Sequence, residues 1–218
     1  MSYEAVVFDN DGVIVELTDW SVIREAVRET FASFDVDPRE EDVEALLRTT
    51  PEGLASVSRR HGLDPADLWR ARDANASAVQ QEAIRAGEKS LYDDVSALST
   101  LPSTLGMVSN NQQETVSFIV EHFDLTEFEV VYGREPTPEG IERKKPSGHY
   151  IERALSALDC DPGEALYVGD SGVDVLAARA VGADSAFIRR EHRVDYDLPA
   201  TPTHEIESLH DLVGVFEG

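Results

Sequence analysis

The chain has few basic residues, a single cysteine and no long hydrophobic run. Its 19 lysines and arginines face 43 aspartates and glutamates, so the net charge is −24 over 218 residues. Such a surface repels phosphate backbones and anionic headgroups, and we expect neither nucleic acid nor a membrane as a partner. Cys160 alone excludes an intramolecular disulfide. No apolar stretch approaches the roughly 20 residues that span a bilayer, and no basic leader is present, so we expect a cytoplasmic protein.

The acidic residues are spread along the whole chain instead of being gathered in a tail. This distribution is similar to that of proteins from salt-loving microbes, in which carboxylates hydrate the surface and salt screens their repulsion. We therefore hypothesise a halophilic protein. Its melting temperature is expected to fall when salt is dialysed away, which thermal melts in concentrated and dilute salt measure. Full stability in dilute buffer would refute the hypothesis.

Hydrophobic residues make up 41% of the chain, which is enough for a folded core. Short apolar runs that stop at turn or polar residues predict buried strands at 4–8, 104–108, 165–168 and 185–188, with 128–132 as a weaker candidate. Apolar residues at helical spacing predict helices at 112–122, 147–158 and 171–181. Strands that alternate with helices predict an α/β fold, in which helices cover both faces of a parallel sheet.

Residues 16–87 interrupt this alternation with a purely helical block. The expected helices are 19–34, 39–48, 52–60 and 65–86, separated by proline- and glycine-containing turns. We expect an all-helical cap domain at 16–87, inserted into a core domain formed by 1–15 and 88–218. Residues 133–143 and 189–203 are expected to be polar loops, and a short strand and helix are expected to end the chain.

Several polar side chains follow the predicted strands at the point where each strand ends. They are Asp9, Asp11, Ser109, Asp170 and Asp174, and Lys145 precedes a helix in a neighbouring crossover. Ligands of open α/β sheets bind at this carboxyl edge. Crowded carboxylates repel one another unless a cation lies among them, and an oxygen-only ligand set suits Mg²⁺. The histidines are scattered without metal-ligand spacing, which argues against zinc.

The order of these residues resembles the motifs of the haloacid dehalogenase superfamily. The chain contains Asp9-Asn10-Asp11-Gly12, then Ser109-Asn110 after an apolar strand, then Lys145-Pro146, and finally 169–174 with the sequence Gly-Asp-Ser-Gly-Val-Asp. The helical block directly after the first motif matches the position of the type 1 cap in that superfamily. The resemblance covers essentially the whole chain and implies a Rossmann-like core.

The resemblance also implies a role for each matching residue. Asp9 resembles the nucleophile that takes up a phosphoryl group, and Asp11 resembles the acid and base. Ser109, Asn110 and Lys145 correspond to the groups around the phosphoryl oxygens. The implied Mg²⁺ ligands are Asp9, the main-chain carbonyl of Asp11, Asp170 and Asp174.

The same residues also allow other interpretations. The first motif alone could be a turn that ends a strand, and Ser109, Asn110 or Asp170 could cap a helix. We expect Lys145 to be the functional lysine and its neighbour Lys144 to be a solvated charge. Arg48 lies in a predicted loop of the cap, where it could meet an anionic part of the substrate or could be an ordinary surface residue.

The resemblance implies a Mg²⁺-dependent phosphatase for a small phosphorylated metabolite, such as phosphoglycolate or a sugar phosphate. The alternatives are a phosphoglucomutase-like phosphotransferase, a 2-haloacid dehalogenase and a catalytically inactive binding module. Dehalogenases lack the second aspartate of the first motif, so Asp11 counts against them. The absence of a lysine in the cap before Lys89 argues against a Schiff-base mechanism. The expected oligomeric state is a monomer or a homodimer.

Overall fold

The structure is a computed structural model that describes residues 3–217, and its centre is a six-stranded sheet in the order β3-β2-β1-β4-β5-β6. All neighbouring strands pair in parallel. The strands are β1 (Ala5–Phe8), β2 (Thr104–Gln112), β3 (Phe128–Arg134), β4 (Ala165–Gly169), β5 (Asp184–Ile188) and β6 (His204–Ile206). The chain builds outward from β1 to β3 on one side and then returns to β4 on the other side, so the strand order reverses next to β1. The predicted α/β class is confirmed.

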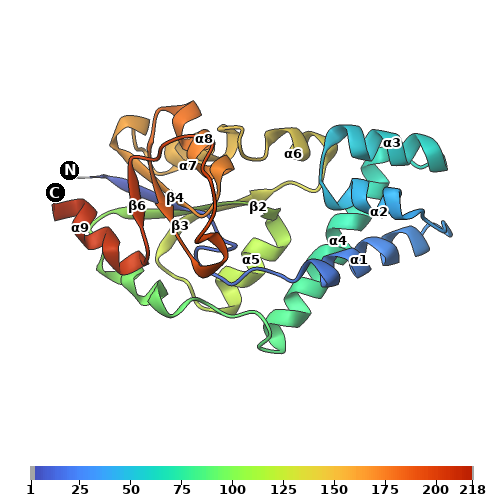
Figure 1. Ribbon diagram of the computed structural model, residues 1–218, viewed down its shortest axis with the longest axis horizontal. Helices are drawn as coiled ribbons and strands as arrows, with labels where there is room; N and C mark the ends of the chain where they lie inside the picture. The colour runs from blue at the N-terminus through green and yellow to red at the C-terminus, as the bar shows by residue number, and fades with distance from the viewer. Residues whose placement is uncertain (1–2, 218) are drawn as a thin grey trace.

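Helices cover both faces of this sheet (Figure 1). Alternate residues of a strand point to opposite faces, so Val6 and Phe8 contribute to one hydrophobic cluster and Ala5 and Val7 to another. The helices of the core are α5 (Gln113–His122), α6 (Pro138–Arg143), α7 (His149–Ala157), α8 (Gly172–Val181) and α9 (Leu212–Glu217), with short 3₁₀ segments that include η1 (Asp93–Thr100), η2 (Pro162–Glu164), η3 (Glu191–Arg193) and η4 (Leu209–Asp211). Helices α7 and α8 pack over the face of Ala5 and Val7, and α5 packs over the face of Val6 and Phe8.

A block of four helices extends beyond one end of the sheet (Figure 1). Its members are α1 (Trp20–Ala32), α2 (Glu40–Leu47), α3 (Pro51–His61) and α4 (Pro65–Arg85). Their apolar faces, joined by Ile141 of α6, form a cluster that is separate from the two clusters of the sheet and includes the fully buried Trp69. This separate cluster supports our proposal that 16–87 form a cap domain on a core of 1–15 and 88–218.

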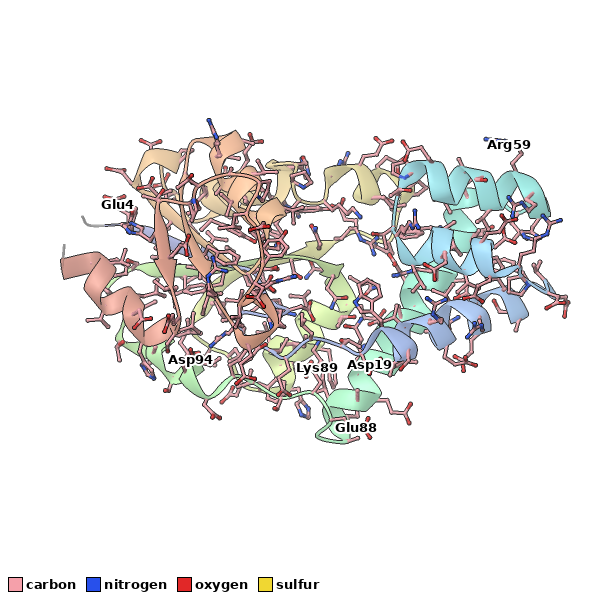
Figure 2. All side chains as sticks on the ribbon, in the orientation of Figure 1. Glu4, Asp19, Arg59, Glu88, Lys89 and Asp94 are labelled. Carbon is pink, nitrogen blue, oxygen red and sulfur yellow. The ribbon has the colours of Figure 1, made fainter. Side chains whose placement is uncertain are left out.

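The two chain segments that join the block to the sheet run side by side. Val15 forms a bridge with Leu91, and the Glu16 main-chain N–H donates to the carbonyl oxygen of Ser90 at 2.9 Å. Figure 2 labels Asp19 and Lys89, which lie in this junction at the start and end of the helical block. Side chains of the junction can therefore contact both the cap and the sheet edge.

Three local predictions differ from the structure. Strand β2 continues to Gln112 instead of ending at 108. Residues 133–143 are not a polar loop, because β3 continues to Arg134 and helix α6 follows. Thr137 caps this helix through the Gly140 N–H and Pro138 occupies its first turn, a start signal that its short length hid in the sequence. The segment 189–203 also contains the short η3 turn.

None of the helices within residues 3–217 has both the length and the apolar character that a membrane crossing requires.

Candidate active site

The carboxyl ends of β1, β2 and β4 bring residues from distant parts of the chain to one edge of the sheet. Asp9 follows β1, Ser109 lies in the extended end of β2, and Asp170 follows β4. All three side chains are buried, with at most 9% of each residue exposed. This edge lies at the reversal of the strand order, where open α/β sheets form their binding crevice.

Three carboxylates gather at this edge. Asp9, Asp170 and Asp174 each offer an oxygen, and these oxygens all lie within 4.8 Å of one another. Asp174 reaches the cluster from the first turn of α8, where its Oδ2 also accepts a hydrogen bond from the Ser171 N–H at 3.0 Å. Oxygen donors at this spacing fit a hard divalent cation, and Mg²⁺ commonly takes few protein ligands of this kind. Asp11 is not a member of this side-chain cluster.

Lys145 holds two of these carboxylates together. Its ammonium lies 2.8 Å from Asp9 Oδ1 and 2.7 Å from Asp174 Oδ1, and it donates to the Tyr167 hydroxyl at 2.8 Å. The residue is only 2% exposed. Burial alone would lower its pKa, but the charges of Asp174 and Asp9 outweigh burial and raise the pKa well above the usual value. Lys145 is therefore a permanent positive charge at the sheet edge.

For the pKa of Asp9, in contrast, burial outweighs the effect of the neighbouring charge on Lys145. Burial raises the pKa of its carboxyl to about 8, the Asp174 and Asp170 charges add to this rise, and Lys145 opposes it. A buried carboxylate beside two others is costly to ionise without a further cation. The site thus favours one more positive charge next to Asp9, which a divalent metal ion would supply.

The Asp11 carboxylate turns away from this cluster toward the junction with the cap. Its Oδ1 forms an ion pair with Lys89, and its Oδ2 accepts a hydrogen bond from Asn111 at 2.9 Å. Lys89 is 2% exposed and also donates to Thr18 at 2.9 Å. Burial raises the pKa of Asp11, but the charge of Lys89 and the hydrogen bonds from Lys89, Asn111 and Asn10 together outweigh burial, so the pKa lies below its usual value. The ion pair keeps Asp11 ionised in this arrangement.

Gly12 shows why the first motif requires glycine after Asp11. Its φ is +81°, in the left-handed region that glycine adopts without strain. A Cβ atom here would lie 2.5 Å from Asp170 Oδ2, closer than atoms can approach. The loop after β1 can approach the carboxylate after β4 only because this residue has no side chain.

Ser109 and Asn110 occupy the end of β2 beside Lys145. Ser109 is 2% exposed, and its hydroxyl accepts a hydrogen bond from the Asn111 N–H at 3.1 Å. The Asn110 side chain binds the main chain of Lys145 twice, accepting from its N–H at 2.7 Å and donating to its carbonyl at 3.1 Å. Asn110 therefore fixes the position of Lys145 at the sheet edge, a contact that the sequence did not reveal.

Two residues from the segment after β5 complete the surroundings of Asp170. His192 Nε2 lies 2.7 Å from Asp170 Oδ2, and Arg193 Nε donates to the same oxygen at 3.0 Å. Sequence reasoning assigned this segment to a polar loop and missed both residues. The predicted strand at 185–188 offered a signal for both residues. Because β5 pairs in parallel with β4, the two strands end at the same edge, and the residues that follow β5 lie near Asp170.

A cavity of about 280 Å³ opens between the sheet edge and the helical block. Its walls include Asp11 and Asn110 from the core and Thr18 and Trp20 from the junction and α1. Arg48 is exposed at the end of α2 and is absent from the residues that line this cavity. The cationic side chains of the wall are instead two buried arginines, Arg72 and Arg134, which sequence reasoning did not select.

Lys144 also differs from its expected role as a solvated charge. Its ammonium donates to the carbonyl oxygen of Thr49 at 2.6 Å and to the Thr49 hydroxyl, and the residue is half-buried. Thr49 belongs to the helical block and Lys144 to the core. The lysine therefore ties the two parts together beside the cavity, whereas Lys145 alone enters the carboxylate cluster.

A parallel sheet that brings buried aspartates and a lysine to its carboxyl edge, beside a cavity under a helical block, is an arrangement suited to hydrolase chemistry. Residues 6–188 match the family described as haloacid dehalogenase-like hydrolase, and the chain belongs to this family. The predicted membership of the haloacid dehalogenase superfamily is thereby confirmed.

The relatives of the chain include named phosphatases that align over nearly its full length. It is 27% identical to a protein named pyrophosphatase PpaX from Anoxybacillus flavithermus, over 99% of this chain and 97% of that protein. It is also 27% identical to a phosphoglycolate phosphatase from Chromobacterium violaceum, over 96% of both chains. Among solved structures, CbbY from Rhodobacter sphaeroides in complex with phosphate matches with a TM-score of 0.70 and 25% identity, over 96% of both chains. The chain is thus a haloacid dehalogenase-like hydrolase, and its full-length relatives include named phosphatases.

Proposed function

We propose that the protein is a Mg²⁺-dependent phosphatase that hydrolyses a small phosphomonoester through an aspartyl-phosphate at Asp9. The observation that carries this proposal is the contact of Asp9 with Lys145 inside the cluster of Asp170 and Asp174. Phosphoryl transfer depends mainly on positioning and charge neutralisation, and this cluster offers a carboxylate nucleophile beside a buried cation. Relatives named for phosphoglycolate and pyrophosphate support a small phosphorylated substrate.

In the first step an Asp9 carboxylate oxygen forms a bond to phosphorus, and the bond from phosphorus to the ester oxygen breaks. Lys145 and the Ser109 hydroxyl neutralise and orient the non-bridging oxygens of the phosphoryl group. The departing alkoxide takes a proton from Asp11. Because Lys89 keeps Asp11 ionised in the present arrangement, this acid step requires Asp11 to leave Lys89 and to carry a proton.

In the second step an ionised Asp11 takes a proton from water, and the water oxygen forms a bond to phosphorus. The bond from phosphorus to the Asp9 oxygen then breaks, which releases inorganic phosphate and regenerates the carboxylate. A bound Mg²⁺ would be held by Asp9, the Asp11 carbonyl, Asp170 and Asp174, and it would supply charge neutralisation for the phosphoryl oxygens.

A panel of substrates with added Mg²⁺ in concentrated salt tests the proposal. We expect release of inorganic phosphate from at least one small phosphomonoester, with a turnover number on the order of 1 to 100 per second for a good substrate. The panel includes 2-chloropropionate to detect dehalogenation by chloride release. It also includes glucose 1-phosphate, so that a mutase would reveal itself by forming glucose 6-phosphate. A panel in which no phosphomonoester releases phosphate refutes the proposal.

A further inference from the structure

Two arginines are buried in the wall of the cavity, although the protein as a whole is strongly acidic. Arg72 comes from helix α4 of the helical block and Arg134 from the end of β3 in the core. They are 4% and 1% exposed, and both line the cavity that Asp11 also lines. Arginines are rarely buried unless their charge is paired, so two buried arginines in one place must be stabilised by groups close to them, even in a chain of net charge −24.

One carboxylate serves both arginines. Asp73 accepts two hydrogen bonds from Arg134, at 2.7 and 2.8 Å, and one from Arg72 at 3.1 Å. The Arg72 Nε atom is buried and has no acceptor among residues 3–217. Trp69 lies beneath both guanidinium groups, whose central carbons are 5.2 and 4.8 Å from its ring centroid. The aromatic ring fixes the two groups without neutralising them.

A third positive group lies close by and has no carboxylate partner in the part of the chain that the structure describes. Among residues 3–217, Lys144 donates only to the carbonyl and hydroxyl oxygens of Thr49, which carry no charge. Burial lowers the pKa of Lys144 to about 8, and the charges of Arg134 and Arg72 contribute to the decrease. Within residues 3–217, Asp73 is thus the one carboxylate that pairs with either arginine, and the titratable amine of Lys144 adds to their positive charge.

An excess of buried positive charge is costly unless an anion neutralises it. The cavity leads from Asp11 to this excess, and its volume of about 280 Å³ is below the range of about 300–1,000 Å³ typical of pockets for drug-sized ligands. An anion that fits this cavity is therefore small, and a molecule that reaches both ends of the cavity would carry it together with the group next to Asp11. That group is the leaving group of the reaction.

We propose that Arg72 and Arg134 form a second anion site, so that the substrate is a small phosphomonoester whose leaving group carries a further carboxylate or phosphate. This inference rests on the proposed phosphatase function. One arginine comes from the cap and the other from the core, so the anion contacts both parts at once. In this proposal Arg72 binds the leaving group and not the transferred phosphoryl group. It therefore determines which substrate binds and takes no part in the chemical steps.

Matched pairs of substrates test the proposal on the unmodified protein at one fixed salt concentration. The first pair is 2-phosphoglycolate and 2-hydroxyethyl phosphate, which differ in the carboxylate. The second pair is fructose 1,6-bisphosphate and fructose 1-phosphate, which differ in the second phosphate. We expect kcat/KM to favour the doubly anionic member of at least one pair by about 100-fold or more, as for a buried charge pair. The pair that shows the preference identifies the anion.

Substitution of Arg72 tests the residue itself. In Arg72→Gln the ratio of kcat/KM within the favoured pair is expected to fall at least tenfold, mainly through a higher KM for the doubly anionic member. Arg72→Lys keeps the charge and is expected to retain part of the preference. Arg70→Gln is the matched control on the same helix, because Arg70 is exposed and pairs with Asp67 outside the cavity. Its ratio is expected to equal that of the parent.

The outcomes separate this inference from the proposed function. Hydrolysis of both members of each pair at similar kcat/KM by the parent overturns the second anion site and leaves the phosphatase function standing. An unchanged ratio in Arg72→Gln, in a variant that melts like the parent, also overturns it. If the parent hydrolyses no phosphomonoester in the panel, the proposed function itself fails.

Discussion

Asp9→Asn is expected to lower the turnover number for phosphate release by about 10⁵-fold, the scale on which loss of a catalytic nucleophile acts. An amide oxygen is a poor nucleophile, and the variant also loses one negative charge from the cluster with Asp170 and Asp174. The substitution is nearly isosteric, and the Asp9 carboxylate is costly to ionise where it is buried. The folded state is therefore expected to be retained, which a thermal melt checks beside the steady-state assay.

Asp161→Asn is the matched control, because Asp161 is exposed next to η2 and outside the carboxylate cluster. It removes the same charge from the chain and is expected to leave turnover unchanged. Rapid quenching of the parent with substrate, followed by borohydride, is expected to convert residue 9 into homoserine, because borohydride reduces an acyl phosphate. Peptide mass spectrometry locates the change. Parent-like turnover in Asp9→Asn, or homoserine at a different aspartate, would show that Asp9 is not the nucleophile.

The fold and the sheet-edge residues were accessible from the sequence for one physical reason. A buried parallel strand is a short apolar run, and its end is marked by the first polar or turn residues. Asp9, Ser109 and Asp170 follow such runs, and the ends of parallel strands meet at one edge whatever the details of packing. The sequence therefore indicated which residues lie close together before any distance was known.

The residues on the cap side of the site could not be predicted from the sequence in this way. Arg72 and Asp73 are adjacent in α4, and Arg134 lies about sixty residues later, so only the docking of the helical block on the sheet brings them together. The position of Arg48 in a loop between helices favoured it, yet that loop position leaves the residue exposed. Helical periodicity tells which face of a helix is buried, but it does not tell which residues of another element lie opposite.

Lys89 illustrates a second limit of the sequence. It is one of only three lysines in the chain, and the sequence before it contains no lysine, which argues against a Schiff-base mechanism in the cap. In the structure it is buried and forms the ion pair with Asp11 because the two segments joining cap and core run side by side. Such a pairing across 78 positions follows from the junction geometry, which no local pattern encodes.

Removal of divalent metal is expected to lower turnover by about 10³-fold or more, since metal-ion catalysis contributes several kcal/mol of charge stabilisation. Chelation with EDTA followed by the phosphate-release assay measures the loss, and an excess of Mg²⁺ is expected to restore activity. Asp170→Asn is expected to raise the Mg²⁺ concentration required for half-maximal activity, because it removes one of the three clustered carboxylates. Undiminished turnover after exhaustive chelation contradicts a role for the metal.

The affinity for Mg²⁺ is expected to increase with pH, by close to tenfold per unit between about pH 5 and pH 8. The reason lies in Asp9, whose carboxyl has a pKa of about 8 in the metal-free protein and an ordinary value of 3.8. A metal ligand must be ionised, so binding below pH 8 releases a proton from this group. Titration calorimetry in buffers of different ionisation enthalpy counts the released protons, and a pH-independent affinity would exclude this coupling.

The same shift predicts that the free energy of unfolding depends on pH differently with and without metal. Between about pH 4 and pH 8 the folded, metal-free protein holds a proton on Asp9 that the unfolded chain has lost. The contribution of Asp9 to the free energy of unfolding therefore decreases as pH rises through this window. Saturating Mg²⁺ is expected to remove the decrease, because the bound ion favours the ionised carboxylate and is bound only by the folded state. Urea unfolding at pH 5.5 and pH 8, with Mg²⁺ and with EDTA, measures the difference. In Asp9→Asn, which has no proton to lose, the part of the pH dependence that belongs to this group is expected to disappear.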